Sequence, residues 1–365
     1  MAERFDIVIV GAGMAGASLA AELAGTTNGK ARILLLEAEL RPGYHATGRS
    51  AAFWDESYGG PGIQPLTTAS GPSLRELGLL KPRGALTIGR VGEEARVEAF
   101  AQAFVALGVD FILEDRSAIA SRIPGLRSNW TIGAFEPHCS DIDVAGLHQH
   151  YLGAARKGGA KLLESARLVR AGRAQSGWRL GLEDGRQVDC EVLVNAAGAW
   201  ADQVAVLAGI KPLGIAPLRR TVAQLRIKPT PPADLPLVLD IDEKFYFKPE
   251  SGRLWLSPHD ETPSQPCDAA PEEIDVAKAI ARLDEVVDWQ VERVEHKWAG
   301  LRSFAPDRLP VFGFDAAVAN FFWFAGQGGF GIQTAPAAAK LAARLLMGEA
   351  GGEVDPARYS PVRFC

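Results

Sequence analysis

The sequence predicts an α/β protein in which a domain with a parallel sheet is interrupted by a second domain built on an antiparallel sheet. Short apolar strands that end in turns of small residues occur near the start, in the middle and near the end of the 365-residue chain. Segments rich in strand-forming residues, separated by Pro and Gly, lie between them. A chain of this length is expected to form two domains. We therefore expect the first domain at 1–78, 140–212 and 298–365, and the second at 79–139 and 213–297.

The first 36 residues predict a strand, a helix and a second strand in that order. Residues 5–10 (FDIVIV) form an apolar, β-branched run, which is typical of a strand buried on both faces. The turn GAGMAG follows, and residues 17–23 continue with helix-forming residues. Residues 32–36 (RILLL) form the next buried strand. Together they make a βαβ unit of about 35 residues, the usual scale of this motif.

The remaining elements are predicted from periodicity and from Pro and Gly breaks. Helices are expected at 93–107, 144–156 and 335–346, and further strands of the first domain at 167–170, 191–197 and 321–325. Antiparallel strands are expected at 219–227, 236–241, 244–248 and 254–257, with Pro-rich loops at 229–236 and 262–271.

Composition narrows the class of protein. A hydrophobic content of 47%, 23% charged residues and a net charge of −5 are typical of a soluble globular protein and argue against a nucleic-acid or membrane surface. There is no apolar run of 18 residues and no basic leader, so a cytoplasmic location is expected. The cysteines at 139, 190, 267 and 365 are far apart, which predicts reduced thiols, no disulfide and no metal site.

The first turn predicts a Rossmann-like dinucleotide site. Gly11, Gly13 and Gly16 follow a predicted strand and precede a predicted helix, which is the context that this motif requires. Glu37 lies at the end of the second strand, where a carboxylate accepts hydrogen bonds from a ribose. The glycines allow a pyrophosphate to approach the helix N-terminus, whose N–H groups attract anions.

Two later segments favour FAD over NAD. NAAG at 195–198 ends the third buried strand, and GQGGFGIQT at 326–334 leads into the last helix. A Gly-rich turn that enters a helix offers free N–H groups to an anion. A reduced flavin carries negative charge near N1 and O2, so this second helix N-terminus suits it.

Taken as a set, six segments resemble the D-amino-acid oxidase superfamily of FAD enzymes, which includes glycine and sarcosine oxidases. They are GYHATGRSAA (43–52), LVNAAGAWAD (193–202), PLRRTVA (217–223), FYFKPE (245–250), WAGLRSF (298–304) and AGQGGFGIQT (325–334). Within the superfamily they most resemble bacterial D-arginine dehydrogenases and their D-amino-acid dehydrogenase relatives. The resemblance covers nearly the whole chain.

The resemblance implies a set of FAD-contacting positions. They are Gly11, Gly13, Met14, Ala15, Gly16, Glu37, Ala38, Thr47, Arg49, Ser50, Ala51, Val169, Ala197, Gly198, Trp200, Gly300, Arg302, Gly328, Gly329, Phe330, Gly331, Ile332, Gln333 and Thr334. Small residues at 46–52 would let the chain lie flat against the ring, and Val169 falls where the family contacts the adenine. No cysteine lies beside Arg302 or Ser303, so FAD is expected to bind without a covalent bond.

The resemblance also implies a substrate site. Arg302 matches a clamp for the substrate carboxylate, since a guanidinium can hold a carboxylate with two parallel bonds. Tyr246 would add a hydroxyl, and Arg220 would line the pocket. Tyr58 would belong to an aromatic lid formed by 53–60, and Gln333 would lie near the substrate amine or the flavin.

Two positions depart from the D-arginine pattern. Relatives that bind a guanidinium side chain carry a Glu near residues 82–86, whereas this chain has Gly84 and Ala85. Relatives carry a His where this chain has Phe53. A buried cation without a partner is costly, so a strong preference for D-arginine is not expected. Asp240 and Asp242 are the acids that would have to replace the missing Glu.

The expected activity is oxidative deamination of a D-amino acid, with hydride transfer from Cα to the flavin and release of a 2-keto acid and ammonia. Oxidation of an N-substituted amino acid or of a 2-hydroxy acid is an alternative, because the same carboxylate clamp serves those substrates. A flavin electron-relay subunit is a further alternative. The electron acceptor is oxygen or a quinone.

Overall fold

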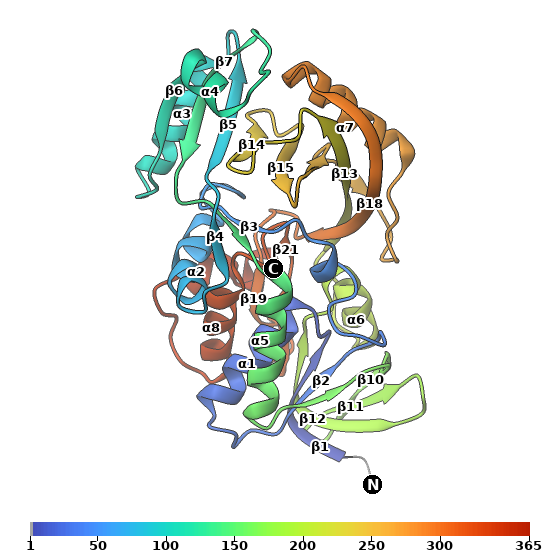
Figure 1. Ribbon diagram of the computed structural model, residues 1–365. Coiled ribbons are helices and arrows are strands. Elements are labelled where there is room, and N and C mark those ends of the chain that lie inside the picture. The colour runs from blue at the N-terminus through green and yellow to red at the C-terminus, as the bar shows by residue number, and fades with distance from the viewer. Residues whose placement is uncertain (1–2) are drawn as a thin grey trace.

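The computed structural model describes residues 3–365 and consists of two halves that meet at the middle of the molecule (Figure 1). One half is built on an eight-stranded sheet, which combines β1 (Glu3–Val10), β2 (Ile33–Leu36), β9 (Lys161–Leu163), β10 (Leu168–Ala174), β11 (Gly177–Leu182), β12 (Gln187–Asn195), β19 (Val311–Phe314) and β20 (Phe321–Ala325). β1 pairs in parallel with β2 and β12, and β20 is parallel to β12. The four strands β1, β2, β12 and β20 are the buried strands predicted at 5–10, 32–36, 191–197 and 321–325.

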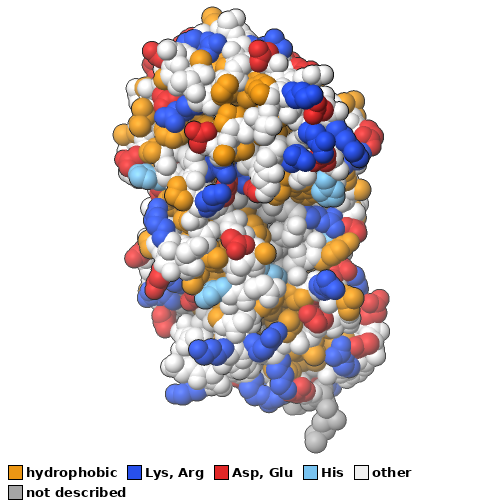
Figure 2. Space-filling view, in the orientation of Figure 1, with side chains coloured by type: hydrophobic (Ala, Val, Ile, Leu, Met, Phe, Trp, Pro, Cys, Tyr) orange, Lys and Arg blue, Asp and Glu red, His pale blue; other side chains and the backbone are white. Residues whose placement is uncertain are grey.

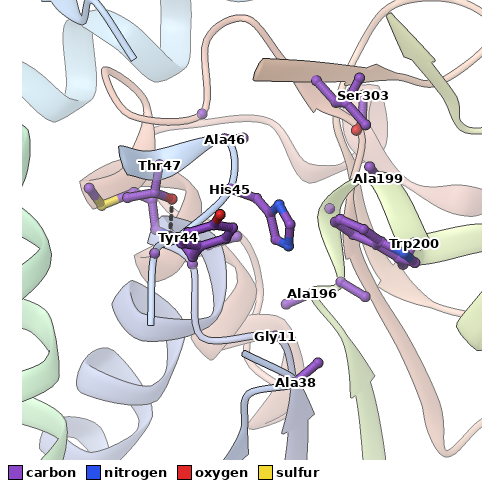
Figure 3. Close-up of a pocket in the computed structure, with 18 of the residues that line it drawn as sticks. Gly11, Ala38, Tyr44, His45, Ala46, Thr47, Ala196, Ala199, Trp200 and Ser303 are labelled. Atoms are coloured by element: carbon purple, nitrogen blue, oxygen red, sulfur yellow. Dashed lines mark hydrogen bonds between the residues drawn. The ribbon is translucent and has the colours of Figure 1, made fainter. Parts of the chain in front are cut away.

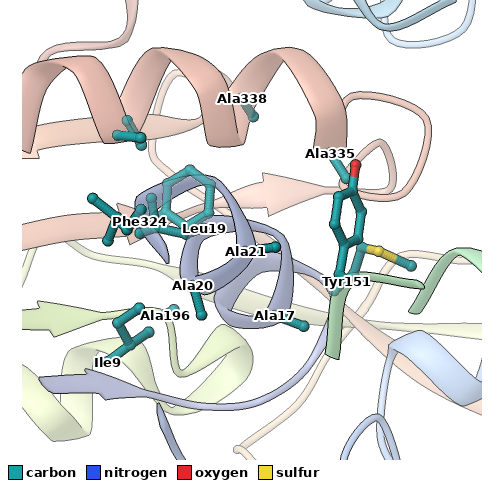
Figure 4. Close-up of a cluster of buried hydrophobic side chains, with 14 of the residues drawn as sticks. Ile9, Ala17, Leu19, Ala20, Ala21, Tyr151, Ala196, Phe324, Ala335 and Ala338 are labelled. Atoms are coloured by element: carbon teal, nitrogen blue, oxygen red, sulfur yellow. The ribbon is translucent and has the colours of Figure 1, made fainter. Parts of the chain in front are cut away.

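Helices cover this sheet. They are α1 (Met14–Thr26), α5 (Val144–Lys157), α6 (Ala201–Leu207) and α8 (Ala335–Leu346). Helix α1 packs between the sheet and α8: Figure 4 shows Ala17 and Ala20 of α1 on the side of Ile9, and Ala21 on the side of Ala335 and Ala338 of α8. Small side chains allow short distances between helices while still removing apolar surface from water.

The other half is built on a ten-stranded sheet. It combines β5 (Ala85–Arg90), β6 (Ile112–Asp115), β7 (Trp130–Glu136), β13 (Ala216–Lys228), β14 (Leu237–Asp240), β15 (Tyr246–Glu250), β16 (Arg253–Ser257), β17 (Thr262–Pro263), β18 (Gln290–Phe304) and β21 (Gln327–Gly328). Helices α3 (Glu94–Val105), α4 (Arg116–Arg122) and α7 (Glu273–Val286) accompany these strands (Figure 1). The predicted antiparallel sheet contains one parallel pairing, in which β14 runs parallel to β5. The two strands come from separate insertions of the chain, so no hairpin joins them.

A small three-stranded sheet lies where the halves meet. It consists of β3 (Phe53–Trp54), β4 (Leu80–Pro82) and β8 (Ser140–Ile142). Helix α2 (Gln64–Glu76), which the sequence did not predict, follows β3. The short 3-10 helices are η1 (Thr47–Arg49), η2 (Gly198–Trp200), η3 (Pro356–Tyr359) and η4 (Pro361–Phe364).

The predicted domain boundaries remain a prediction, and one of them falls inside an element. β18 runs from residue 290 to residue 304, across the boundary at 298, and β21 joins the larger sheet from the last segment. Among residues 3–365, no helix is long and apolar enough to cross a membrane. Within residues 3–365, the four cysteines form no disulfide bond. Figure 2 shows basic and acidic side chains interspersed over the face in view.

Candidate functional site

The larger cavity extends from the first glycine turn to the middle of the molecule and has a volume of about 330 Å³. Most of the predicted FAD positions line it: Gly11, Gly13, Met14, Ala15, Glu37, Ala38, Thr47, Arg49, Ser50, Ala197, Gly198, Trp200, Gly300, Arg302, Gly328, Gly329, Gly331 and Ile332. These residues are spread over more than 300 positions of the chain. The fold therefore brings the three small-residue turns of the sequence to one cavity.

The first glycine turn needs its glycines for steric reasons. Gly11 has φ +102°, and a Cβ atom there would lie 2.5 Å from the Ala196 carbonyl oxygen. A Cβ on Gly16 would lie 1.8 Å from the Gly11 carbonyl oxygen, so Gly16 serves helix packing. Thr47 Oγ1 accepts a hydrogen bond of 2.9 Å from the Met14 N–H, which Figure 3 marks. Helix α1 begins without a side-chain cap at Gly13, which leaves N–H groups of its first turn for an anion.

Glu37 is buried at the end of β2, beside this turn. Its Oε2 accepts a hydrogen bond of 3.0 Å from Ala12 N–H, and its Oε1 accepts one of 2.9 Å from Glu39 N–H. Burial raises the pKa of Glu37, although these two N–H groups oppose the shift. Each carboxylate oxygen has a second lone pair, so Glu37 can still accept hydroxyl donors of a ribose.

Two aromatic side chains that face each other form part of the wall. Figure 3 shows the ring of His45 turned toward Trp200, and the ring centroids are 4.6 Å apart. His45 Nε2 lies 3.1 Å from Glu39 Oε1. Trp200 was predicted from the resemblance and His45 was not, because a single His in a loop carries no motif of its own.

The predicted Pro-rich loop at 262–271 lies against this cavity. Arg49 pairs with Asp268 and donates a hydrogen bond of 2.7 Å to the Ala269 carbonyl oxygen. Tyr44 donates a hydrogen bond of 3.0 Å to the same Asp268. Cys267, an exposed thiol, lines the cavity wall and was not among the predicted residues. The loop thus connects the second domain to the segment that follows β2.

Six predicted FAD positions do not line the larger cavity: Gly16, Ala51, Val169, Phe330, Gln333 and Thr334. The side chain of Val169 is 43% exposed on β10, and its neighbours Ala166, Arg167 and Leu168 form the cavity wall instead. A strand alternates its side chains between two faces, so a shift of one residue changes the contact. Ala51 and Gln333 line a second cavity described next.

The second, smaller cavity adjoins the first and has a volume of about 20 Å³. Ser50, Arg302, Gly329 and Ile332 line both cavities. Strand register explains how its charged groups meet. Arg220 of β13 lies opposite Gly300 of β18, two residues from Arg302, so both guanidinium groups leave the same face of the sheet. Arg219 leaves the opposite face, where it pairs with Glu272 and Asp275.

Arg302 is the most unusual side chain of this cavity. It is 8% exposed, and its Nε has no hydrogen-bond partner among the described residues. Burial lowers the pKa of Arg302, and the nearby Arg220 adds to this effect. Removing an unpaired guanidinium from water costs several kcal/mol unless a ligand compensates. The geometry therefore fits an anion bound beside Arg302.

Tyr58 lies in a network of hydrogen bonds over this cavity. Its hydroxyl lies 3.3 Å from Arg220 Nη1 and 3.4 Å from His259 Nε2. His259 Nδ1 lies 2.6 Å from the Glu243 carbonyl oxygen, which assigns the proton of a neutral ring to Nδ1 and leaves Nε2 as the acceptor. Burial, together with Arg220 and Arg302, lowers the pKa of His259 to about 3. The sequence offered no signal for His259, which is a single His after a Pro.

The other predicted substrate residues have different surroundings. Tyr246 is buried and lines the smaller cavity together with Phe53, and their rings are 6.0 Å apart. Gln333 also lines it, but its amide donates hydrogen bonds to the Tyr58 carbonyl oxygen and to Thr67 Oγ1. Gln333 thus anchors the Tyr58 segment to α2.

The predicted lid, residues 53–60, packs largely into the interior of the protein. Trp54 and Asp55 are fully buried, and α2 begins four residues after Gly60. Within residues 53–60, only Phe53 and Tyr58 line the smaller cavity. Gly59 and Gly60 have positive φ, which shapes the turn into α2.

Asp240 and Asp242, the acids that would have to replace the missing Glu, do not line the smaller cavity. Asp240 leaves the same sheet face as Val238, whose side chain belongs to the helix-covered core, whereas Leu239 packs beside Tyr246. Asp242 pairs with Arg96 and Lys244 at the surface. Within residues 3–365, no cluster of three His, Cys, Asp or Glu side chains could hold a metal ion.

The arrangement fits FAD in shape and charge. The glycine turn, the uncapped start of α1 and Glu37 suit a pyrophosphate and a ribose at one end. The turn of residues 327–332 lines the other end beside Arg302. A flat ring there would separate the first glycine turn from the smaller cavity, which leaves the anion site of Arg302 next to the ring.

Comparison with known proteins supports this interpretation. Residues 6–345 match the family model DAO, described as FAD dependent oxidoreductase. Hydrogen cyanide synthase subunit HcnC of Pseudomonas aeruginosa is 26% identical, with all of this chain and 97% of that protein aligned.

Two solved structures have the same fold. L-proline dehydrogenase from P. horikoshii has a TM-score of 0.87 and 21% identity, with 100% of this chain and 98% of that chain covered. Glycine oxidase from Geobacillus kaustophilus has a TM-score of 0.85 and 23% identity, with 99% of each chain covered. These comparisons do not single out the D-arginine dehydrogenases, so that closer resemblance stays a prediction.

Proposed function

The chain belongs to the DAO family of FAD-dependent oxidoreductases, and from this premise we propose that it oxidises the Cα–N bond of a D-amino acid with a small, uncharged side chain. The observation that carries the proposal is Arg302, a buried guanidinium beside a small cavity, whose Nε has no hydrogen-bond partner within residues 3–365. A substrate carboxylate supplies the missing acceptor, and two parallel hydrogen bonds would fix its orientation.

The size and lining of the smaller cavity support a small substrate. Its volume is about 20 Å³, and Ala51, Phe53 and Ile332 form apolar parts of its wall. Among the described residues that line it, none is acidic. A cationic side chain would therefore be buried without a partner, which is costly. This supports the expectation that D-arginine is not strongly preferred.

The residues around the cavity support a reaction with little acid–base chemistry. Arg302 and Tyr246 hold the carboxylate, and Phe53 and Ile332 exclude water from the other side. Two guanidinium groups in a buried site lower the pKa of an ammonium group, so the substrate amine gives its proton to solvent water as it enters the site. FAD, when bound, supplies the acceptor for the hydride that leaves Cα. The released imine hydrolyses to a 2-keto acid and ammonia.

A second candidate is oxidation of an N-substituted or secondary amino acid. The absence of an acidic side chain among the described lining residues favours it, because nothing there requires a primary ammonium. L-proline dehydrogenase, which shares the fold, is named for a secondary amino acid. A 2-hydroxy acid would use the same carboxylate clamp.

Anaerobic mixing of the FAD-loaded protein with a substrate panel tests these proposals. The panel contains small D- and L-amino acids, N-methyl amino acids, L-proline and 2-hydroxy acids, and flavin absorbance is followed. We expect rapid loss of absorbance with a small D-amino acid. Bleaching by N-substituted acids alone would support the second candidate, and no bleaching at all would support an electron-relay subunit. Oxygen uptake compared with quinone reduction then identifies the electron acceptor.

A further inference from the structure

Two buried carboxyl groups behind Tyr58 have no part in the proposed reaction. Asp55 is 0% exposed and Glu136 is 1% exposed. Asp55 follows β3, at the junction of the two halves in Figure 1, and Glu136 ends β7 of the ten-stranded sheet. Glu136 lies opposite Ala85, and register places both on the sheet face that carries Tyr246. Burying two acidic side chains costs free energy unless they are paired or hydrogen-bonded, so their partners must be identified.

One oxygen of each carboxyl group holds the backbone of the turn at 55–58. Asp55 Oδ1 accepts hydrogen bonds from Ser57 N–H at 2.9 Å, Ser57 Oγ at 2.7 Å and Tyr58 N–H at 3.0 Å. Glu136 Oε1 accepts one from Glu56 N–H at 2.8 Å. The backbone N–H groups of Glu56, Ser57 and Tyr58 thus all donate hydrogen bonds to these two acids.

The other oxygen of each group is unpartnered: Asp55 Oδ2 and Glu136 Oε2 are buried and have no donor among the described residues. Because the first oxygens of the two groups bind consecutive N–H groups of one turn, the two carboxyl groups lie close together. Two ionised carboxylates are acceptors only, so a hydrogen bond between them requires one proton. Burial, and then the charge of Asp55, raise the pKa of Glu136 well above its usual range.

The groups around the pair supply no competing charge. Lys248 donates a hydrogen bond of 2.6 Å to Asp141, which also pairs with Arg83 at 2.6 Å. Lys248 lies 3.7 Å from Glu250 as well. Cys139 is buried beside the acids, and burial together with their charges raises the pKa of its thiol, so it stays neutral. Lys248, whose charge acts on Cys139, is therefore engaged by other acids.

We propose that Asp55 and Glu136 share one proton and act as positioning residues, which hold the turn at 55–58 against β7 and keep the Tyr58 hydroxyl at the substrate cavity. Loss of the proton leaves two buried negative charges in contact, and their repulsion opens the turn. Tyr58 then leaves Arg220 and His259, and the site binds a carboxylate less tightly. The inference rests on the proposed function only in assuming that the cavity binds a carboxylate.

Amide variants test the shared proton. Glu136→Gln keeps an oxygen for Glu56 N–H and offers an amide donor to Asp55 at every pH. Asp55→Asn does the reverse. The double variant places two amide donors face to face, with their oxygens already used by the turn. We therefore expect each single variant to replace the proton and the double variant to fail, a non-additive pattern that simple loss of packing does not produce.

Two measurements on the FAD-loaded protein, made over a series of pH values from about 5 to 9, report the result. Hydrogen exchange of a peptide that contains residues 55–58, corrected for the intrinsic pH dependence, reports on the turn. Titration with acetate, followed by flavin absorbance, reports on the carboxylate site. In the wild type, protection falls and the acetate Kd rises about tenfold or more above the same pH. Both single variants stay flat and close to the low-pH wild type, and the double variant is unprotected throughout.

A wild type whose exchange does not depend on pH would overturn the proposal, and so would a double variant that equals the sum of the two singles. If exchange follows the expected pattern but acetate never binds, the shared proton stands and the carboxylate site fails. If the variants do not fold, the pH dependence of wild-type unfolding still tests the shared proton. A raised pKa in the folded state means that stability falls as pH rises from the unfolded value of 4.5 toward the folded value, and a flat profile contradicts the pair.

Discussion

The larger and the smaller cavity are lined by different kinds of residues. The larger cavity, where we propose that FAD binds and which we call the FAD end, is lined by backbone and small residues such as Gly11, Gly13 and Ala197, which belong to short sequence motifs. The smaller cavity, where we propose that the substrate binds and which we call the substrate end, is lined by long side chains such as Arg302 and Tyr246, which come from separate strands. The comparison teaches that steric fit governs one end, whereas charge and desolvation govern the other.

Gly11→Ala should have the largest effect, because it tests steric fit at the FAD end. The new Cβ would lie 2.5 Å from a backbone oxygen, at a residue with φ +102°. We expect FAD affinity to fall by more than about 100-fold, since backbone clashes and strain at such φ cost a few kcal/mol. Bound flavin per protein after gel filtration measures it.

Gly25→Ala is the matched control for this substitution. Gly25 lies in α1 away from the cavity lining, and its Cβ would meet no atom within 4 Å. We expect FAD affinity to change by less than about twofold. An equal loss in both variants would mean that steric fit at Gly11 does not distinguish this end.

Arg302→Met should have the next largest effect, because it tests charge at the substrate end. Removing a buried charged partner costs about 2–5 kcal/mol, so KM for the best substrate should rise about 30- to 4,000-fold while FAD stays bound. Arg219→Met is the control. Arg219 belongs to the same pair of strands but faces α7, so KM should change less than about twofold. Equal changes in both variants would remove Arg302 as the carboxylate clamp.

His259→Gln should have a moderate effect that depends on pH. The folded state holds the pKa of His259 near 3, below the ordinary 6.5, so the unfolded chain binds a proton more readily. Wild-type stability should therefore fall as pH drops from 6.5 toward 3, by on the order of 1–3 kcal/mol from this residue. Denaturant unfolding of wild type and variant across this range measures the difference.

His138→Gln provides the comparison for His259, since His138 is exposed and pairs with Asp110 at the surface. Its unfolding profile should parallel that of the wild type. If the wild-type and His259→Gln profiles also run parallel, the imidazole is not held neutral by the two arginines, and the substrate end is less desolvated than its geometry indicates.

Cys267→Ser should have the smallest effect. Cys267 lines the FAD cavity, and we expect the flavin to be held there without a covalent bond. Acid denaturation of the wild type should release all the flavin, and the variant should keep its FAD affinity within about twofold. Flavin that stays with the denatured wild type but not with the variant would show attachment at this thiol.

Local sequence patterns predicted much of the fold. The β1–α1–β2 unit and helix α8 match the expected ranges within a few residues, since apolar periodicity and glycine breaks are local signals. Helix α2 was missed, because Pro72 within it and its weakly apolar sequence give little helical signal. The parallel pairing of β5 with β14 was missed for another reason, since it joins two segments about 150 positions apart.

The sequence by itself determined the FAD end: the glycine turns, Glu37 and the turn before α8 are contiguous motifs whose chemistry follows from the backbone. The resemblance added Arg302, Tyr246 and Arg220. Only the tertiary structure decided what surrounds them. Strand register selected Arg220 over Arg219, burial made His259 a neutral acceptor, and the fold brought Asp55 and Glu136 to the same turn. Charge and burial depend on neighbours that are distant in sequence, so no local pattern encodes them.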